Sequence, residues 1–373
     1  MDDSVITSST YYGDTLPLWV KNFNERKTID AYFGKTWNKI LPEEAYALCE
    51  KDDARYESDE DGLGRIFPHV IQGKEKQKKS KSFYNAFLSS PFASEVLIAF
   101  AKEAIIKEGL GRRDVPDMLC ISLSANDYIG HTFGMHSQEV MEMTIRTDKL
   151  LEDLLQFLDQ EIGLLNFIIT CTADHGATPV PEYINEKYPN VDAGKSEAKE
   201  LYAKAEQVLS EKFGTLATAK WIDNIVDYNI YIAENACAEK NISVKDAAVL
   251  LCDSLRFETG IAEIVTTEDM RNGTVQSPFR GNIEKSYFPH RSGDVIYILK
   301  PFFIRNAGDP GTHGNPYSYD AHVPLIFFGK GISSKTSSEK CEPIDIATTL
   351  ASLLGIEFPP MSVGRVLEVQ EKK

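Results

Sequence analysis

Residues 164–176, Leu-Leu-Asn-Phe-Ile-Ile-Thr-Cys-Thr-Ala-Asp-His-Gly, decide the fold. The mostly apolar part, 164–172, has the length and composition of a strand buried in a parallel sheet. Two ionisable residues follow, Asp174 and His175, and then Gly176, which allows a sharp backbone turn. An ionisable pair is costly to bury without a partner, so this strand end predicts a binding or catalytic site.

Helical and apolar segments alternate ahead of this strand. Apolar side chains recur every three or four residues over 94–108 and 137–160, which predicts two amphipathic helices. Between them, 118–123 is a second apolar run of strand length. This alternation indicates an α/β fold, a mostly parallel sheet sandwiched by helices. Cys120 and Cys171 lie in the two apolar runs and are predicted to be buried.

The rest of the chain is organised around this unit as a single domain, residues 1–373. Residues 1–95 alternate aromatic and charged side chains and are expected to form an irregular cap segment. Residues from about 180 to 290 have the pattern of an inserted α+β segment. Short apolar strands are predicted again at 294–299 and 324–328, followed by a closing helix at 344–354.

The composition excludes several classes of protein. The chain has 373 residues and a net charge of -16, and an acidic surface repels nucleic-acid phosphates, so nucleic acid is not expected as the main partner. No apolar run approaches the roughly 18 to 20 residues of a membrane span. Small phosphorylated substrates stay compatible with this charge, because a bound cation reverses the local field. The first residues lack a secretory signal, which predicts a cytoplasmic chain as written.

Two further segments carry metal-ligand residue types. Asp127 and His131 follow the run at 118–123 and are four residues apart, a spacing that puts both on one face of a helical turn. His313 lies between glycines in Gly311-Thr-His-Gly314, ahead of the strand at 324–328.

Taken singly, each pattern is more typical of a surface pair, a hydrogen-bonded loop or an exposed histidine than of a metal site. Together they place aspartate and histidine, which are both zinc ligands, beside several predicted strands. Five candidates exceed the ligands of one tetrahedral ion, so a two-metal site is predicted. Such sites clamp the entering and leaving oxygens of a phosphoryl transfer.

Three motifs in this order and spacing resemble the alkaline phosphatase superfamily: Ser124-Ala-Asn-Asp-Tyr-Ile-Gly-His-Thr-Phe-Gly134, Thr172-Ala-Asp-His-Gly176, and Gly311-Thr-His-Gly314 followed by Tyr319-Asp-Ala-His-Val-Pro-Leu. The chain is most similar to the bacterial phosphate-irrepressible alkaline phosphatases and the type I phosphodiesterase/nucleotide pyrophosphatase branch. The resemblance implies an alkaline phosphatase-like fold and zinc-dependent hydrolysis of phosphoric esters through a covalent phospho-Thr or phospho-Ser intermediate. It also implies small phosphorylated substrates.

The resemblance further implies two Zn2+ ions per complete active site. One ion would be held by Asp127, His131 and His313. The other would be held in part by Asp174 and His175.

His322 competes with His313 as the last ligand, because it also precedes an apolar strand. We prefer His313, since its glycine neighbours suit close packing around an ion. The remaining histidines match no ligand motif and are expected to be structural or exposed: His69, His136 and His290.

The family's nucleophile and a further Asp ligand have no counterpart that we can identify. Residues 7–10, Thr-Ser-Ser-Thr, follow no predicted strand and no Asp in the required context. We therefore expect an N-terminally incomplete catalytic domain with one complete zinc site, whose full-length form would be periplasmic or secreted. The alternative is a catalytically inactive zinc-binding fragment or pseudoenzyme of the family. An exposed sheet edge would favour association. The sequence leaves monoester or diester preference open.

Overall fold

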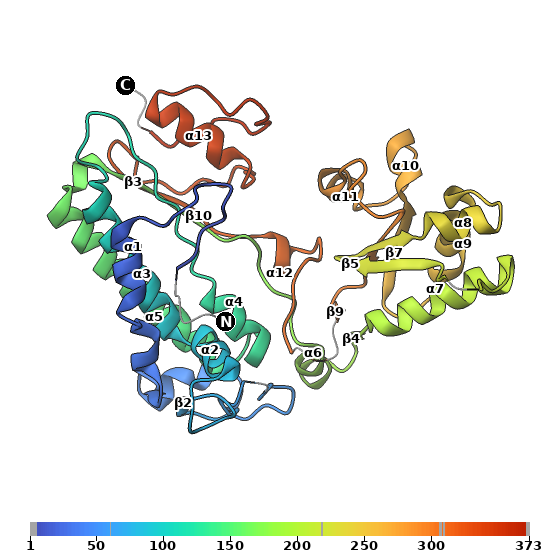
Figure 1. The fold of residues 1–373 in the computed structure, drawn as a ribbon, viewed down its shortest axis with the longest axis horizontal. Coiled ribbons are helices and arrows are strands. Elements are labelled where there is room, and N and C mark those ends of the chain that lie inside the picture. The colour runs from blue at the N-terminus through green and yellow to red at the C-terminus, as the bar shows by residue number, and fades with distance from the viewer. Residues whose placement is uncertain (1–5, 60, 218, 306–307, 309, 371–373) are drawn as a thin grey trace. The chain divides into compact units, whose positions relative to one another are not determined.

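The computed structural model describes residues 6–59, 61–217, 219–305, 308 and 310–370. The chain divides into two compact units (Figure 1). Unit 1 comprises Met1–Asp174 and Val323–Lys373, and unit 2 comprises His175–His322. Each unit has its own hydrophobic core.

Unit 1 combines helices with two short strand pairs. Its α-helices are α1 (Leu18–Glu25), α2 (Lys81–Leu88), α3 (Pro91–Glu108), α4 (Ala125–Phe133), α5 (Gln138–Glu161) and α13 (Asp345–Leu354). Its 3-10 helices are η1 (Thr28–Tyr32), η2 (Glu43–Leu48) and η3 (Leu164–Asn166). Its strands are β1 (Lys35–Trp37), β2 (His69–Ile71), β3 (Ile168–Thr172) and β10 (Leu325–Gly329).

Two long helices, α3 and α5, lie side by side in unit 1 (Figure 1) and confirm the helices predicted at 94–108 and 137–160. The first begins earlier than predicted because Pro91 suits a first helical turn, and it ends at Gly109 with φ 63°. The second begins where the Ser137 side chain accepts a hydrogen bond from the Val140 N–H. They bury a shared apolar cluster of Ile98, Ile105, Leu154 and Leu158.

The strands predicted at 164–172 and 324–328 are observed as β3 and β10, but they pair with each other in antiparallel register. Leu325 lies opposite Thr172. The chain leaves unit 1 just after β3 and returns just before β10, so the two strands are related as in a hairpin whose loop is unit 2. Connectivity therefore overrides the parallel pairing expected for these strands.

The buried strand predicted at 118–123 is not formed. These residues have no helix or strand assignment and no backbone hydrogen bond to any described residue. Ile121 and Leu123 pack against the cluster on α3 and α5, whereas Met118 is 59% exposed. Cys120 is exposed, so its predicted burial is wrong, because no described element covers the face away from the helices.

Residues 1–95, expected to be irregular, contain α1, α2 and the β1–β2 pair. Their aromatic residues supply much of the unit 1 core, in which Trp37 and Phe83 are fully buried. The aromatic spacing was therefore a packing signal rather than a loop signal.

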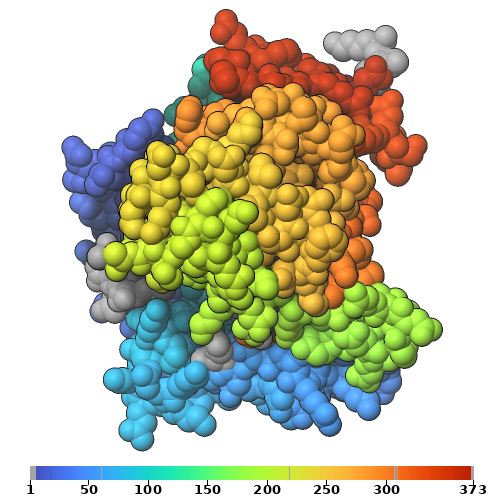
Figure 2. All heavy atoms as spheres, turned by 90° about the vertical axis from the view of Figure 1, so that its right-hand side faces the viewer, coloured from blue at the N-terminus to red at the C-terminus, as the bar shows by residue number. Residues whose placement is uncertain are grey.

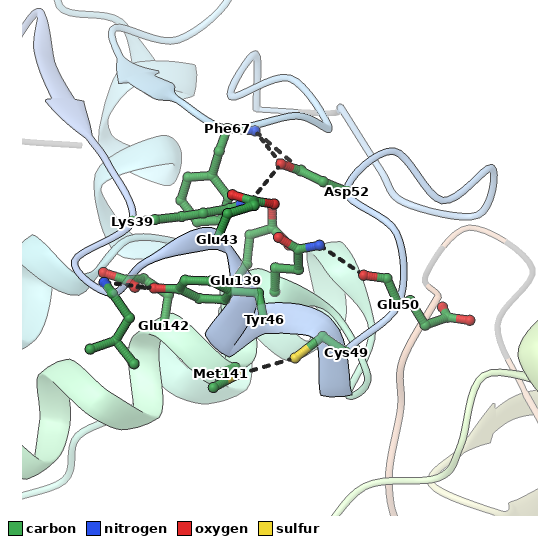
Figure 3. A network of polar contacts seen from close by, with 12 residues as sticks. Lys39, Glu43, Tyr46, Cys49, Glu50, Asp52, Phe67, Glu139, Met141 and Glu142 are labelled. Atoms are coloured by element: carbon green, nitrogen blue, oxygen red, sulfur yellow. Dashed lines mark hydrogen bonds and ion pairs between the residues drawn. The ribbon is translucent and has the colours of Figure 1, made fainter.

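A polar network joins this N-terminal region to the first turns of α5 (Figure 3). Glu142 is fully buried and accepts hydrogen bonds from the Tyr46 hydroxyl, from the Ile40 N–H at 3.2 Å and from Arg146 Nε at 2.7 Å. One turn earlier, the Gln138 amide donates to the Glu50 carbonyl at 2.9 Å. The buried carboxyl group of Glu142 is tolerated here because both of its oxygens accept hydrogen bonds.

Unit 2 is an α+β unit. Its strands are β4 (Gly194–Lys195), β5 (Ile222–Val226), β6 (Asn229–Ile232), β7 (Ile261–Thr266), β8 (Val295–Leu299) and β9 (Phe303–Ile304). Its helices are α6 (Pro181–Lys187), α7 (Ala198–Phe213), α8 (Glu234–Glu239), α9 (Val244–Leu255), α10 (Thr267–Asn272), α11 (Arg280–Ser286) and α12 (Ser318–Ala321). The unit includes the predicted α+β segment near 180–290 and extends beyond it at both ends.

A four-stranded sheet in the order β5-β6-β8-β7 organises unit 2. The pairs β5–β6, β6–β8 and β7–β8 are antiparallel. Helices α7 and α9 cover one face and bury the larger core, while α10 and α11 contribute to a smaller cluster on β8. Figure 2 shows the outside of this unit, where yellow-green atoms adjoin yellow ones, in keeping with the packing of α7 against α9.

Candidate functional site

The helix α4 positions the first pair of predicted ligands in unit 1. Its buried residues, Ala125, Ile129 and Phe133, are four apart and form one stripe facing the core. Asp127 and His131 are also four apart and lie outside this stripe, with an Oδ1 to Nε2 distance of 3.4 Å. The sequence spacing therefore does bring a carboxylate and an imidazole together at a half-exposed surface.

The second pair of predicted ligands follows β3. Asp174 is the last residue of this part of unit 1, and His175 is the first residue of unit 2. The Nδ1 of His175 lies 2.8 Å from the carbonyl oxygen of Gly176. Because a carbonyl only accepts, Nδ1 donates in this contact, and Nε2 is the ring nitrogen that a metal-binding role would use.

Gly176 is needed for close approach rather than for a positive φ. A Cβ at this position would lie 2.2 Å from the Tyr319 carbonyl oxygen. The Gly176 N–H donates to the Asp320 carbonyl at 2.6 Å, and the Ala177 N–H donates to the Tyr319 carbonyl at 3.1 Å. These bonds hold the segment after His175 against α12.

His313 lies directly against His175 within unit 2. Their imidazole rings are stacked, with centroids 3.4 Å apart and planes 13° from parallel. A backbone bridge fixes the two segments, since the Thr178 N–H donates to the Thr312 carbonyl at 2.8 Å. Two predicted ligands 138 positions apart in sequence are thus brought together by short backbone hydrogen bonds.

A buried polar group supports this histidine pair. Asp320 is 2% exposed and accepts hydrogen bonds from the Asn315 N–H at 2.7 Å and the Thr178 hydroxyl at 3.4 Å. Burial raises the pKa of Asp320, and the bond from Asn315 and the nearby His175 oppose that rise. The sequence motif contained Asp320, but its place beside the histidine pair was missed because only the fold brings it near His175.

The other histidines lie in different surroundings. His322, the competing ligand, is exposed at the end of α12. His69 is fully buried and paired with Glu139, with 2.9 Å between Nε2 and Oε1. His290 is exposed and His136 is half-buried.

The N-terminal hydroxyl residues 7–10 are exposed, and no strand precedes α1 within residues 6–17. Within the described parts of the chain, no helix combines the length and apolar character needed to cross a bilayer.

Sequence and structure comparisons identify the family. The model of the family described as type I phosphodiesterase/nucleotide pyrophosphatase matches residues 4–314. A protein named alkaline phosphatase PhoV from Synechococcus elongatus is 33% identical over 96% of this chain and 63% of its own length. A protein named calcium-transporting ATPase from Myroides odoratus is 32% identical over 97% of this chain and 65% of its own length. This chain therefore spans a little under two thirds of these relatives.

The crystal structure of alkaline phosphatase PafA superimposes on the chain with a TM-score of 0.88 and 28% identity. It covers 97% of this chain, which in turn covers 68% of the PafA chain. This similarity confirms the predicted fold class and the resemblance to alkaline phosphatases. The chain belongs to the type I phosphodiesterase/nucleotide pyrophosphatase family, within the alkaline phosphatase superfamily, and has its α/β fold.

Proposed function

We propose that this chain carries zinc ligands of a hydrolase for small phosphoric esters. The observation that carries the proposal is the stacking of His175 on His313, with Nδ1 of His175 already engaged by a carbonyl. Metal-binding histidines commonly use one ring nitrogen for the ion and the other for such a hydrogen bond. The donor set of imidazole and carboxylate groups also fits zinc.

The family resemblance assigns the ligands. Asp127, His131 and His313 would hold one zinc ion, and Asp174 and His175 would contribute to a second. Bound zinc would supply Lewis-acid stabilisation of negative charge on the phosphoryl oxygens.

The protein's own residues orient these ligands. The i,i+4 spacing on α4 keeps Asp127 beside His131. The Gly176 carbonyl accepts a hydrogen bond from Nδ1 of His175 and so orients this ring. The family's covalent Thr or Ser nucleophile is not among the residues that we can assign.

The alternative function is a catalytically inactive zinc-binding protein of the same family. Residues 7–10 are exposed and irregular, and a nucleophile needs an adjacent activating group held in fixed geometry, so we assign no nucleophile to them. Both functions predict zinc binding, and only the first predicts phosphoric ester hydrolysis in the complete protein.

Metal analysis tests the shared part of the proposal. After zinc loading and dialysis, we expect about one tightly held zinc per chain, as for a three-ligand site. His131→Ala and His313→Ala should each release it, whereas His290→Ala, at an exposed histidine outside the motifs, should not. Absence of zinc after loading, or unchanged binding in His131→Ala, would refute the assignment.

Hydrolysis of an aryl phosphate tests the catalytic part. This chain alone should turn over far below the typical enzymatic rate of about 10 per second. A typical rate would show that the nucleophile is present after all. If a coding sequence lies in frame upstream of Met1, the chain extended by that sequence should show zinc-dependent hydrolysis. A folded, zinc-loaded product without hydrolysis would favour the inactive alternative.

We also propose that copies of this chain associate through unit 1, at β10 and the run 118–123. Ile326 and Phe328 on β10 are 55% and 44% exposed, and residues 118–123 have no backbone hydrogen bond to any described residue. Unpaired strand-like edges and apolar patches favour association. Phe328→Lys should lower the sedimenting mass, while Leu48→Lys, at a leucine 94% exposed on η2, should not. A monodisperse monomer would contradict the proposal.

A further inference from the structure

The hairpin between β5 and β6 has an unusual turn residue. The strands are joined by two residues, Asp227 and Tyr228, whose φ angles are 45° and 65°. Such turns are normally occupied by Asn, Asp or Gly, because a larger side chain is strained at positive φ. A bulky residue kept in this conformation points to a use for its side chain.

The Tyr228 side chain reaches the loop that carries His313. Its hydroxyl donates a hydrogen bond to the His313 carbonyl oxygen at 3.3 Å. Its ring lies against Gly314, where an added Cβ would meet Tyr228 Cε2 at 2.9 Å. Gly314 has φ +102°, so both its backbone conformation and its lack of a side chain suit this contact. The Tyr228 side chain therefore contacts the backbone of both His313 and Gly314.

Tyr228 is itself held firmly by the sheet of unit 2. Its carbonyl accepts a hydrogen bond from the Tyr297 N–H at 3.0 Å, and the two rings meet edge to face at 5.5 Å. The Arg305 guanidinium lies over the Tyr228 ring, with its Cζ 5.7 Å from the ring centroid.

We propose that Tyr228 is a positioning residue, which transmits the rigidity of the β5-β6-β8-β7 sheet to His313 and thereby presents that histidine to a metal ion. The inference rests on the proposed function, in which His313 is a zinc ligand. Groups that orient a metal ligand typically change metal affinity by about 10- to 100-fold when they are removed.

Two substitutions distinguish the contribution of the Tyr228 hydroxyl to zinc binding from that of its ring. Tyr228→Phe keeps the ring packing and removes the hydrogen bond, so we expect zinc to bind about two- to tenfold more weakly. Tyr228→Asn keeps a residue that tolerates positive φ and removes both contacts, so we expect a loss of about 10-fold or more. The matched control is Tyr231→Phe in the same hairpin, whose hydroxyl donates to the Arg291 carbonyl at 3.0 Å.

Zinc affinity is measured by chelator competition on the full chain, and the absorption spectrum of the cobalt-loaded chain reports ligand geometry. We expect both to change in Tyr228→Asn, with the Phe variant recovering most of the affinity, and neither to change in Tyr231→Phe. Wild-type affinity and spectrum in both Tyr228 variants would overturn the inference. If His313→Ala also binds zinc normally, the ligand assignment fails; if only His313→Ala loses zinc, the tyrosine proposal alone fails.

Discussion

A buried carboxyl group in unit 1 should make the protein less stable at alkaline pH. Glu57 is 6% exposed, and burial raises its pKa from the ordinary 4.5 to about 9, with smaller contributions from Glu139 and Asp52. Glu139 and Asp52 belong to the polar region shown in Figure 3. Between these two pKa values, Glu57 is therefore protonated in the folded state and ionised in the unfolded state.

The sign follows from proton linkage. Between pH 4.5 and 9 the folded chain binds more protons than the unfolded chain at this site, so the free energy of unfolding falls as pH rises. If the folded state kept its full proton excess at Glu57, the free energy of unfolding would fall by about 1.4 kcal/mol per pH unit. Water reaches part of the group and screens it, so we expect a total loss of roughly 3 kcal/mol from pH 5 to 9.

Glu57→Gln keeps the shape and removes the titration. At pH 5 the variant should resemble the wild type, and at pH 9 it should be more stable by about 3 kcal/mol. Urea unfolding is followed by the fluorescence of the two tryptophans of unit 1, Trp19 and Trp37, of which Trp37 is fully buried in the core. Both proteins carry Trp221→Phe, which removes the tryptophan of unit 2.

The control is Glu25→Gln, at an exposed glutamate on α1. Its stability should follow the wild type at every pH. The reasoning is refuted if the Glu57→Gln and wild-type curves stay parallel between pH 5 and 9, because Glu57 would then titrate alike in the folded and unfolded states.

Substitutions at three further positions test the packing. Gly176→Ala should lower the stability of unit 2 by about 1–3 kcal/mol, since its Cβ would collide with the Tyr319 carbonyl; a neutral effect on urea unfolding would contradict that close approach. Asp320→Ala should cost about 1–3 kcal/mol by leaving the buried N–H of Asn315 without its acceptor, and Asp320→Asn should recover part of it; equal losses in both variants would count against the hydrogen bond. Trp37→Ala should cost about 3–5 kcal/mol in unit 1, as measured by circular dichroism, and a loss below 1 kcal/mol would argue against its full burial.

The main local elements were predictable from sequence because their signals are local. Apolar spacing predicted α3 and α5, and a proline and a glycine mark the ends of the first. The spacing of Asp127 and His131 likewise predicted their proximity, because four residues are about one helical turn.

Long-range relations were not predictable in the same way. An apolar run such as 118–123 predicts a strand only if a neighbouring strand supplies its hydrogen bonds, and no described residue does. The antiparallel pairing of β3 with β10 depends on where the chain re-enters unit 1, which no local pattern encodes.

The sequence by itself therefore determined the family, the long helices α3 and α5, and the residue types of the candidate metal site. Only the tertiary structure decided that His313 stacks on His175 while His322 stays exposed. It also decided that the Tyr228 hydroxyl contacts the loop that carries His313. The physical reason is that ligand chemistry is a property of single side chains, whereas their convergence depends on backbone hydrogen bonds and close contacts between segments more than 100 residues apart.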